Sequence, residues 1–226
     1  MVESKFIKSM KKRSLLKFVA LLPLFLVSCS ETDDELNEFS NWKDKNEKYF
    51  TDIYIHADSA INNGSKDWKI IREWSLEDRY STIKENNIVV NILKTGNAST
   101  CPIYTDSVRV HIQGRILPST TYSKGYPFWE SFDDELDVTT SLPFLLSANG
   151  TIPSGTNTLN SKQIDGLSTA LQQMHLGDRW IVSVPYQYGY GTVNNSSPFV
   201  PAYSTLIFDV SLVGIYHSGN RIPKWK

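Results

Sequence analysis

Two stretches with apolar residues at every second position, about a hundred residues apart along the chain, place the tightest limit on the fold. Apolar residues occupy every second position of residues 108–113 and again of residues 206–213. A period of two indicates strands with one core face and one more polar face. Between them, apolar residues at helical spacing over 164–174 indicate one helix, with Ser161 as N-cap and Gly177 as C-terminal stop. We therefore predict an α+β fold, a mostly antiparallel β-sheet wrapped around one short helix.

The region ahead of this sheet predicts a helical segment. Aromatic and aliphatic residues recur at three- and four-residue steps over residues 36–61, and Asn62-Asn63-Gly64 would end a helix there. The apolar stripe is expected to pack on the main domain or on a partner subunit, because the polar face carries both signs of charge. A homodimer through this helix is left open. Residues 68–80 are either helix or an extra strand, and residues 88–93 indicate a strand.

The first 28 residues have the pattern of an export signal. Three basic residues at 11–13 precede an apolar run over 15–27 that is too short to cross a bilayer as a mature helix, and residue 1 or residue 10 is the start. The run ends in Leu26-Val27-Ser28-Cys29, which resembles a bacterial lipobox. Cys29 is therefore predicted to carry lipid and to bind the protein to a membrane. The expected location is the outer membrane of a Gram-negative bacterium, facing the periplasm or the cell surface.

Composition divides the rest of the chain. The acidic residues that follow Cys29 form a solvated tether that buries nothing. The predicted organisation is a lipoprotein signal peptide (1–28), an acidic tether (29–35), an N-terminal helical and connecting segment (36–85), the main domain (86–217) and a C-terminal tail (218–226).

Charge and cysteine content exclude several classes of function. Lys and Arg total 23 against 24 Asp and Glu, a net charge of −1, so no nucleic-acid partner is expected. If Cys29 carries lipid, Cys101 has no disulfide partner, and without a nearby His it is expected to be a bystander. The four histidines are scattered without metal-ligand spacing, so neither a metal nor a cofactor is expected.

Six segments match, in order, the pattern of the FKBP-type peptidyl-prolyl isomerases. They are Val108 to Gly114, Phe132-Asp133, Pro143-Phe144, Ile164 to Arg179, Pro185 to Gly191 and Ser204 to Leu212. One such match occurs often by chance, whereas six in order over roughly 130 residues resemble the family as a whole. The match needs insertions at 118–130 and 149–160, and both are predicted to be loops because they are rich in polar residues, Gly and Pro.

The resemblance implies an apolar cleft for proline-containing segments of exported proteins. The implied catalytic residues are Tyr190, Asp133, Phe132, Ile164 and Phe208, and the implied substrate-binding residues are Phe144, Leu167, Ile112, Phe199 and Val200. In this interpretation the backbone N–H of Ile164 and the hydroxyl of Tyr190 donate hydrogen bonds to the substrate carbonyl. Asp133 orients polar edges near that carbonyl, and Phe199-Val200 form the tip of a flap over the bound peptide.

Two departures from the family pattern bear on activity. Ile112 stands where the family commonly has Tyr, and Leu167 stands where it has the Trp floor of the pocket, so reduced activity is expected. The apolar pocket residues would also suit an ordinary core, whereas Asp133 and Tyr190 need partners or a purpose. Two hypotheses remain: an isomerase, and a non-catalytic chaperone or assembly lipoprotein that binds extended segments.

Overall fold

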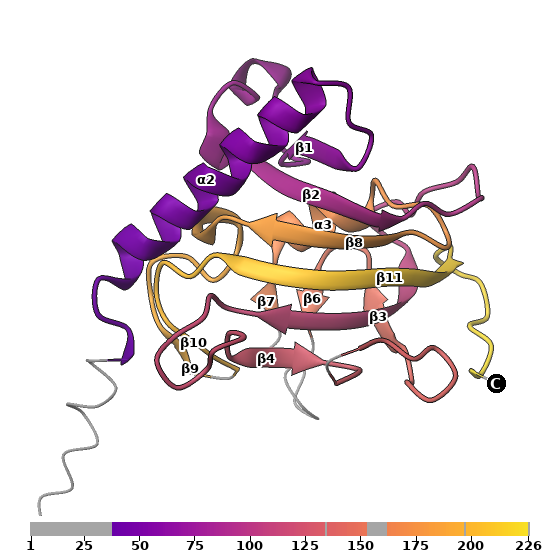
Figure 1. Ribbon diagram of the computed structural model, residues 1–226. Coiled ribbons are helices and arrows are strands. Elements are labelled where there is room, and N and C mark those ends of the chain that lie inside the picture. Colours follow the sequence, from indigo (N-terminus) through magenta and orange to yellow (C-terminus); the bar gives the residue numbers. More distant parts are fainter. Residues whose placement is uncertain (1–37, 134, 153–161, 197, 226) are drawn as a thin grey trace, which may run out of the picture.

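The computed structural model describes residues 38–133, 135–152, 162–196 and 198–225 (Figure 1). The predicted lipidation site Cys29, the acidic tether, the predicted N-cap Ser161 and most of the 149–160 insertion lie outside the described residues. The helices are α2 (Trp42–Asn62) and α3 (Asp165–Leu171), with 3-10 turns η1 (Asp78–Tyr80), η2 (Lys84–Asn86) and η4 (Tyr186–Tyr188). The strands are β1 (Trp68–Arg72), β2 (Asn87–Lys94), β3 (Ser107–Arg115), β4 (Pro127–Glu130), β5 (Phe144–Ser147), β6 (Thr151–Ile152), β7 (Lys162–Gln163), β8 (Arg179–Val184), β9 (Asn195–Ser196), β10 (Phe199–Val200) and β11 (Leu206–Tyr216).

A seven-stranded antiparallel sheet dominates the molecule (Figure 1). Its strand order is β1-β2-β8-β11-β3-β4, and β5 also pairs with β3. Helix α3 lies behind the sheet in Figure 1, and its buried side chains belong to the same core cluster as those of β3, β8 and β11. Gly166 lets α3 approach the sheet closely, since a Cβ there would lie 2.3 Å from a methyl group of Val184. The predicted α+β fold is confirmed.

The two alternating stretches both lie at the centre of the sheet. Val108, Val110 and Ile112 are fully buried on the face of β3 that packs on α3. The opposite, outer face of β3 was expected to be more polar, and it is, but it is also covered. The guanidinium of Arg109 donates to the carbonyl of Pro223, and the ring of His111 lies 6.4 Å from that of Trp225. The C-terminal tail therefore shields this polar face from water.

The N-terminal segment packs on the sheet, as its apolar stripe predicted. Helix α2 begins at Trp42, later than expected, and ends at Asn62 with Gly64 at φ +85°. Phe50 and Ala57 are buried against Val89 of β2. The undecided segment after the helix contains a strand, because β1 pairs antiparallel with β2 along its whole length and extends the sheet. Figure 1 shows α2 crossing the end of the sheet diagonally.

Three expectations are corrected. Helix α3 begins at Asp165 and ends at Leu171, shorter than the predicted helix, because residues 162–163 are extended and pair with β6. Gly177 takes φ +96° but lies in a turn past the helix end, where its N–H donates to Leu212 O. Neither insertion is all loop, since the last four residues of 118–130 form β4 and Thr151–Ile152 of 149–160 form β6.

Candidate functional site

Three aromatic rings from three distant segments meet on the α3 side of the sheet. The Phe128 ring lies 6.0 Å from that of Tyr190 and 5.7 Å from that of Phe208, both in edge-to-face geometry. Phe208 is fully buried, and Tyr190 and Phe128 are 4% and 7% exposed. Edge-to-face contacts suit the ring quadrupoles, so the three rings form a well-packed, dry cluster.

Phe128 reaches this cluster because of a bulge in β4. The β3–β4 register shifts between Gly114 and Arg115, so that Phe128 has no partner residue on β3. Bulges re-aim a side chain in this way. Gly114 makes the room, since a Cβ there would lie 2.7 Å from Phe128 Cζ and 2.9 Å from Phe208 Cε1. The glycine that ends the first matched motif is therefore required by the two rings that pack over it.

This arrangement corrects the assignment of Phe132. Its side chain is buried, but it does not belong to the core cluster that contains Phe128, Tyr190 and Phe208. Its carbonyl accepts a hydrogen bond from Gln113, whose side chain lies on the outer face of β3. The strand register therefore gives Phe128 the position that sequence matching gave to Phe132. The available signal was the Gly125 turn followed by the aromatic-rich run Tyr126 to Trp129.

With Phe128 in the place of Phe132, the next residue is Trp129 and not the expected carboxylate of Asp133. Trp129, which follows Phe128, stacks on Phe144 with ring centroids 5.3 Å apart and an interplanar angle of 25°. Both rings are half-buried, at the edge of the cluster. Asp133 is exposed and makes no hydrogen bond with any described residue, so its predicted place among the pocket rings is wrong. An indole stands where the resemblance implied a carboxylate.

The backbone role predicted for Ile164 is also corrected. The side chain is fully buried in the core cluster, as expected. Its N–H, however, donates to the carbonyl of Gly150 at 3.0 Å. A substrate carbonyl would have to displace this bond before the N–H could bind it.

The hydroxyl of Tyr190 is the one polar group that the three rings themselves carry. Burial raises the pKa of Tyr190 to about 12, so the phenol stays protonated and can donate at any ordinary pH. Over the described part of the chain the hydroxyl has no hydrogen-bond partner. The ammonium of Lys162 lies 5.0 Å from the centre of the Tyr190 ring and donates to the Tyr190 carbonyl at 2.8 Å. Desolvation is the largest cause of a lowered pKa at Lys162.

The remaining predicted residues divide into two groups. Ile112, Leu167 and Val200 are fully buried in the same cluster as Tyr190 and Phe208. Phe199 instead turns away, toward Phe39 at 5.9 Å and Tyr126 at 6.4 Å between ring centroids. Val200, rather than Phe199, is the flap residue that meets the cluster.

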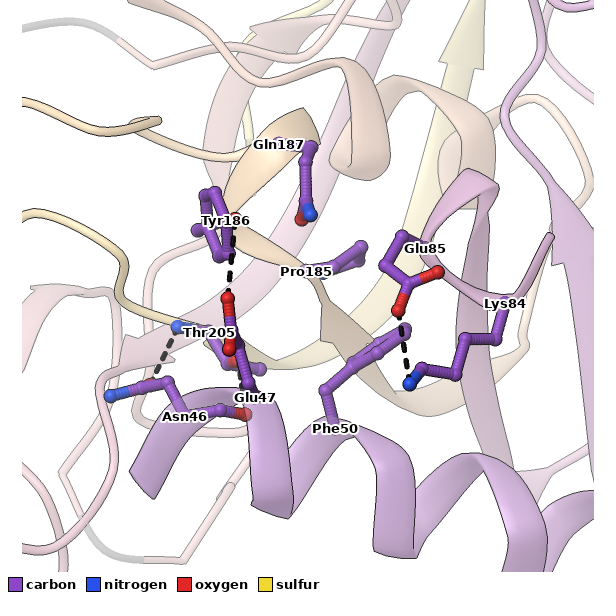
Figure 2. Close-up of a pocket in the computed structure, with 9 residues that line it drawn as sticks. All are labelled: Asn46, Glu47, Phe50, Lys84, Glu85, Pro185, Tyr186, Gln187 and Thr205. Carbon is purple, nitrogen blue, oxygen red and sulfur yellow. Dashed lines mark hydrogen bonds and ion pairs between the residues drawn. The ribbon is translucent and has the colours of Figure 1, made fainter. Parts of the chain in front are cut away.

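A separate cavity of about 300 Å³ lies between α2 and the turn that precedes Tyr190 (Figure 2). It is lined by Asn46, Glu47, Phe50, Lys84, Glu85, Pro185, Tyr186, Gln187 and Thr205. Its interior bonds are polar: the Tyr186 hydroxyl lies 3.4 Å from a Glu47 carboxylate oxygen, and Lys84 pairs with Glu85 at 3.0 Å. None of the residues predicted for the site lines this cavity.

Among the described residues, no group of three or more His, Cys, Asp or Glu side chains is placed to hold a metal ion, and no helix is long and apolar enough to cross a membrane. Cys101 is half-buried, and desolvation is the main cause of a raised thiol pKa. A raised pKa lowers the thiolate fraction and fits a bystander.

The part of the sequence that contains the ring cluster matches a known protein family. Residues 100–213 match the family described as FKBP-type peptidyl-prolyl cis-trans isomerase. The matched part is half of the chain and holds the three rings, their glycine and the flap. The chain therefore belongs to this family.

Several relatives carry names from the same family. The macrophage infectivity potentiator of Trypanosoma cruzi is 28% identical over 134 residues, 59% of this chain and 56% of the relative. The FKBP-type 22 kDa peptidyl-prolyl cis-trans isomerase of Escherichia coli is 26% identical over 131 residues, 58% of this chain and 51% of the relative. The chain thus spans about half the length of these two relatives.

A shorter relative and a solved structure complete the comparison. FK506-binding protein 1A of Aspergillus fumigatus is 31% identical over 120 residues, 53% of this chain and 87% of the relative. The structure of a peptidyl-prolyl cis-trans isomerase from Pseudomonas syringae is similar with a TM-score of 0.44 and 16% identity, over 74% of this chain and 96% of that one.

Proposed function

We propose that this protein is a peptidyl-prolyl cis-trans isomerase that acts on proline-containing segments of exported proteins. The observation that carries the proposal is the dry cluster of Phe128, Tyr190 and Phe208, with the single phenol hydroxyl as its polar group. Membership of the FKBP-type family supports the same reaction.

The chemistry of the bond explains why such a cluster suits the reaction. Rotation about an X-Pro bond loses amide resonance, with a barrier of about 18–20 kcal/mol. The twisted amide has a less polar carbonyl than the planar amide, so it is favoured by surroundings that exclude water. Surroundings that bind the twisted state better than the planar state lower the barrier.

In this proposal, different residues exclude water and donate the hydrogen bond. Phe128 and Phe208, with Ile112 and Leu167, exclude water, and the Trp129–Phe144 stack offers a flat apolar edge for the segment beside the proline. The hydroxyl of Tyr190 donates a hydrogen bond to the substrate carbonyl. Because its pKa is raised to about 12, it donates without losing its proton, and no covalent intermediate forms.

The export and lipid part of the proposal is supported by the sequence at Cys29. Several acyl chains, each methylene of which contributes about 0.8 kcal/mol when buried, would hold the protein at a membrane surface. Expression in a Gram-negative host with a labelled fatty acid tests this. Label should enter the wild-type chain and be absent from Cys29→Ala, whereas equal label in both would exclude lipidation at Cys29.

A second function is favoured by two other observations. Trp129 stands where a carboxylate was implied, and the N–H of Ile164 is already bonded to Gly150. Both changes remove polar contacts to the amide while leaving apolar surface for an extended segment. A non-catalytic chaperone or assembly lipoprotein is therefore the alternative.

A protease-coupled assay on Ala-X-Pro-Phe peptides separates the two functions. The isomerase proposal expects the purified full-length chain to accelerate the slow cis-to-trans phase in proportion to its concentration. An uncatalysed rate from protein that circular dichroism shows to be folded would refute it. In that case, suppression of the aggregation of an unfolded test protein would support the chaperone.

A further inference from the structure

Residues 38–46, the first described residues together with the start of α2, are here called the strap. They lie across two loops that flank the aromatic cluster. The first of these loops, residues 118–126, leads into β4. The Glu38 carboxylate accepts hydrogen bonds from the backbone N–H and the hydroxyl of Thr121, both at 2.8 Å. A hydrogen bond from the Ser119 side chain is the largest cause of a lowered Glu38 pKa, followed by the bond from the Thr121 N–H, so the carboxylate is charged at neutral pH. The ammonium of Lys45 donates to the carbonyl of Pro118.

The strap also binds the opposite loop. Residues 198–204, here called the flap, include β10 and the turn after it. The indole N–H of Trp42 donates to the hydroxyl of Ser204 at 2.8 Å, and this hydroxyl donates to the carbonyl of Pro201 at 2.7 Å. Just past the flap, the Thr205 N–H donates to the side-chain oxygen of Asn46 at 2.7 Å. Trp42 is 5% exposed and Asn46 is fully buried, so water does not compete for these bonds.

A line of aromatic rings joins the strap to both loops. The Phe39 ring lies 4.9 Å from the Trp42 ring within the strap and 5.9 Å from the Phe199 ring of the flap. Phe199 in turn lies 6.4 Å from Tyr126, at the end of the 118–126 loop. Phe39 is thus the strap side chain that packs on Phe199 of the flap, beside the hydrogen bond from Trp42 to Ser204.

Both ends of this line are next to the rings of the site. Val200, the residue after Phe199, is fully buried in the cluster of Tyr190 and Phe208. Phe128 is two residues beyond Tyr126 and packs on the same rings. In an extended chain, neighbouring side chains point to opposite sides, so a shift of Phe199 also moves Val200.

We propose that the strap holds the flap against the loop before β4, and that Phe39 is a positioning residue for the pocket beneath them. It touches no reacting atom. It keeps Phe199 in place, and through the backbone it keeps Val200 in the pocket wall. A wall already held in its bound position saves the cost of ordering it when substrate binds.

Hydrogen exchange measured by mass spectrometry tests the strap without any assay of activity. Phe39→Ala in the full-length chain should raise the exchange rate of peptides that cover 198–204 by about threefold or more, because local opening becomes easier. Peptides from β3 and β11 should keep the wild-type rate. The matched control is Ile55→Ala, which removes an exposed apolar side chain from α2, the helix that begins within the strap, at a position away from the flap. Wild-type exchange at 198–204 in Phe39→Ala would overturn the proposal, and so would a rise shared by the whole sheet.

Kinetics then connect the strap to the pocket, and this part rests on the proposed isomerase function. Phe39→Ala should raise KM for a proline peptide by about threefold to tenfold and leave kcat within about twofold, since it affects substrate binding and not the bond rotation. An unchanged KM together with a faster-exchanging flap would overturn the positioning role. An inactive wild-type chain would refute the isomerase proposal instead, and the exchange experiment would still decide whether the strap holds the flap.

A milder pair of variants covers the case in which Phe39→Ala does not fold. Trp42→Phe keeps a ring in the strap but removes the N–H that binds Ser204, and Glu38→Ala removes the bonds to Thr121 at the surface. Each should raise exchange in the loop that it releases, 198–204 for Trp42→Phe and 118–126 for Glu38→Ala. Wild-type exchange in both loops would overturn the proposal.

Discussion

The two faces of strand β3 are both hidden from water, yet they differ in chemistry. On the α3 side, Ile112 and Gly114 face a cluster of rings with one hydroxyl. On the outer side, Arg109 and His111 lie under the C-terminal tail. The Arg109 guanidinium lies over the rings of Tyr216 and Trp225, 5.7 Å and 5.4 Å from their centres. Neither ring nitrogen of His111 has a hydrogen-bond partner among the described residues.

The two faces of β3 should therefore respond differently to pH. The α3 face holds apolar groups and a phenol whose pKa is raised to about 12, so it should behave the same across ordinary pH. The outer face contains a buried histidine whose pKa burial lowers, so it should respond to acid. The ring cluster on the α3 face of β3 should be insensitive to pH, whereas the outer face under the C-terminal tail should be sensitive to acid. The following predictions test this contrast, from the largest expected effect to the smallest.

Phe128→Ala should have the largest effect. Removing a packed ring from the centre of the cluster leaves a cavity, which should lower the free energy of unfolding by about 3–5 kcal/mol. Urea denaturation followed by fluorescence measures it. Phe128→Leu keeps most of the volume and should fold, but with lower isomerase activity than Phe132→Leu, its matched control. Equal activity in the two leucine variants would contradict the assignment of Phe128 to the site.

Gly114→Ala should have the next largest effect. The added methyl would lie within 3 Å of Phe128 and Phe208, so the rings must shift, and overpacking of this kind costs about 1–3 kcal/mol. Thermal melting measures the loss, and Ser107→Ala, at the start of the same strand, serves as control. A melting temperature equal to that of the control would show that the rings are not tightly packed over Gly114.

Tyr190→Phe should affect activity more than stability. Loss of the donor to the substrate carbonyl should lower kcat/KM about tenfold, equivalent to about 1.4 kcal/mol. The melting temperature should hardly change, because the hydroxyl has no partner among the described residues. The wild-type rate should be flat from about pH 6 to pH 9, since the phenol keeps its proton throughout. Tyr122→Phe, at an exposed ring, is the control, and equal kcat/KM in the two variants would argue against the donor role.

His111→Leu should have the smallest effect, visible only in acid. Burial lowers the pKa of folded His111 below its ordinary 6.5, so the unfolded chain binds the proton more readily. Stability in the wild type should therefore fall as the pH drops from 6.5 toward the lowered pKa. His111→Leu should reduce this slope, and His56→Gln, at an exposed histidine of α2, should not. Urea midpoints across this pH range provide the measurement, and parallel slopes in all three proteins would locate the acid response elsewhere.

Several segments of the fold were predictable from the sequence. The alternation over 108–113 and 206–213 predicted the two central strands, and the stripe over 36–61 predicted a packed helix. Tyr190, Phe208, Ile112, Leu167 and Val200 do meet in one cluster. The Phe132-Asp133 dipeptide pointed to the wrong phenylalanine, because a two-residue match carries no information about which strand residue faces inward.

Local pattern alone determined the two central strands, the packed helix α2 and the family of this protein, because alternation, helical spacing and motifs are properties of neighbouring residues. Tertiary structure decided which phenylalanine joins the cluster of Tyr190 and Phe208. A bulge in β4 and the missing side chain of Gly114 together admit Phe128, and Trp129 follows it in place of the expected carboxylate. Strand register and close packing depend on contacts between segments far apart in the chain, so the sequence read along its length could not supply them.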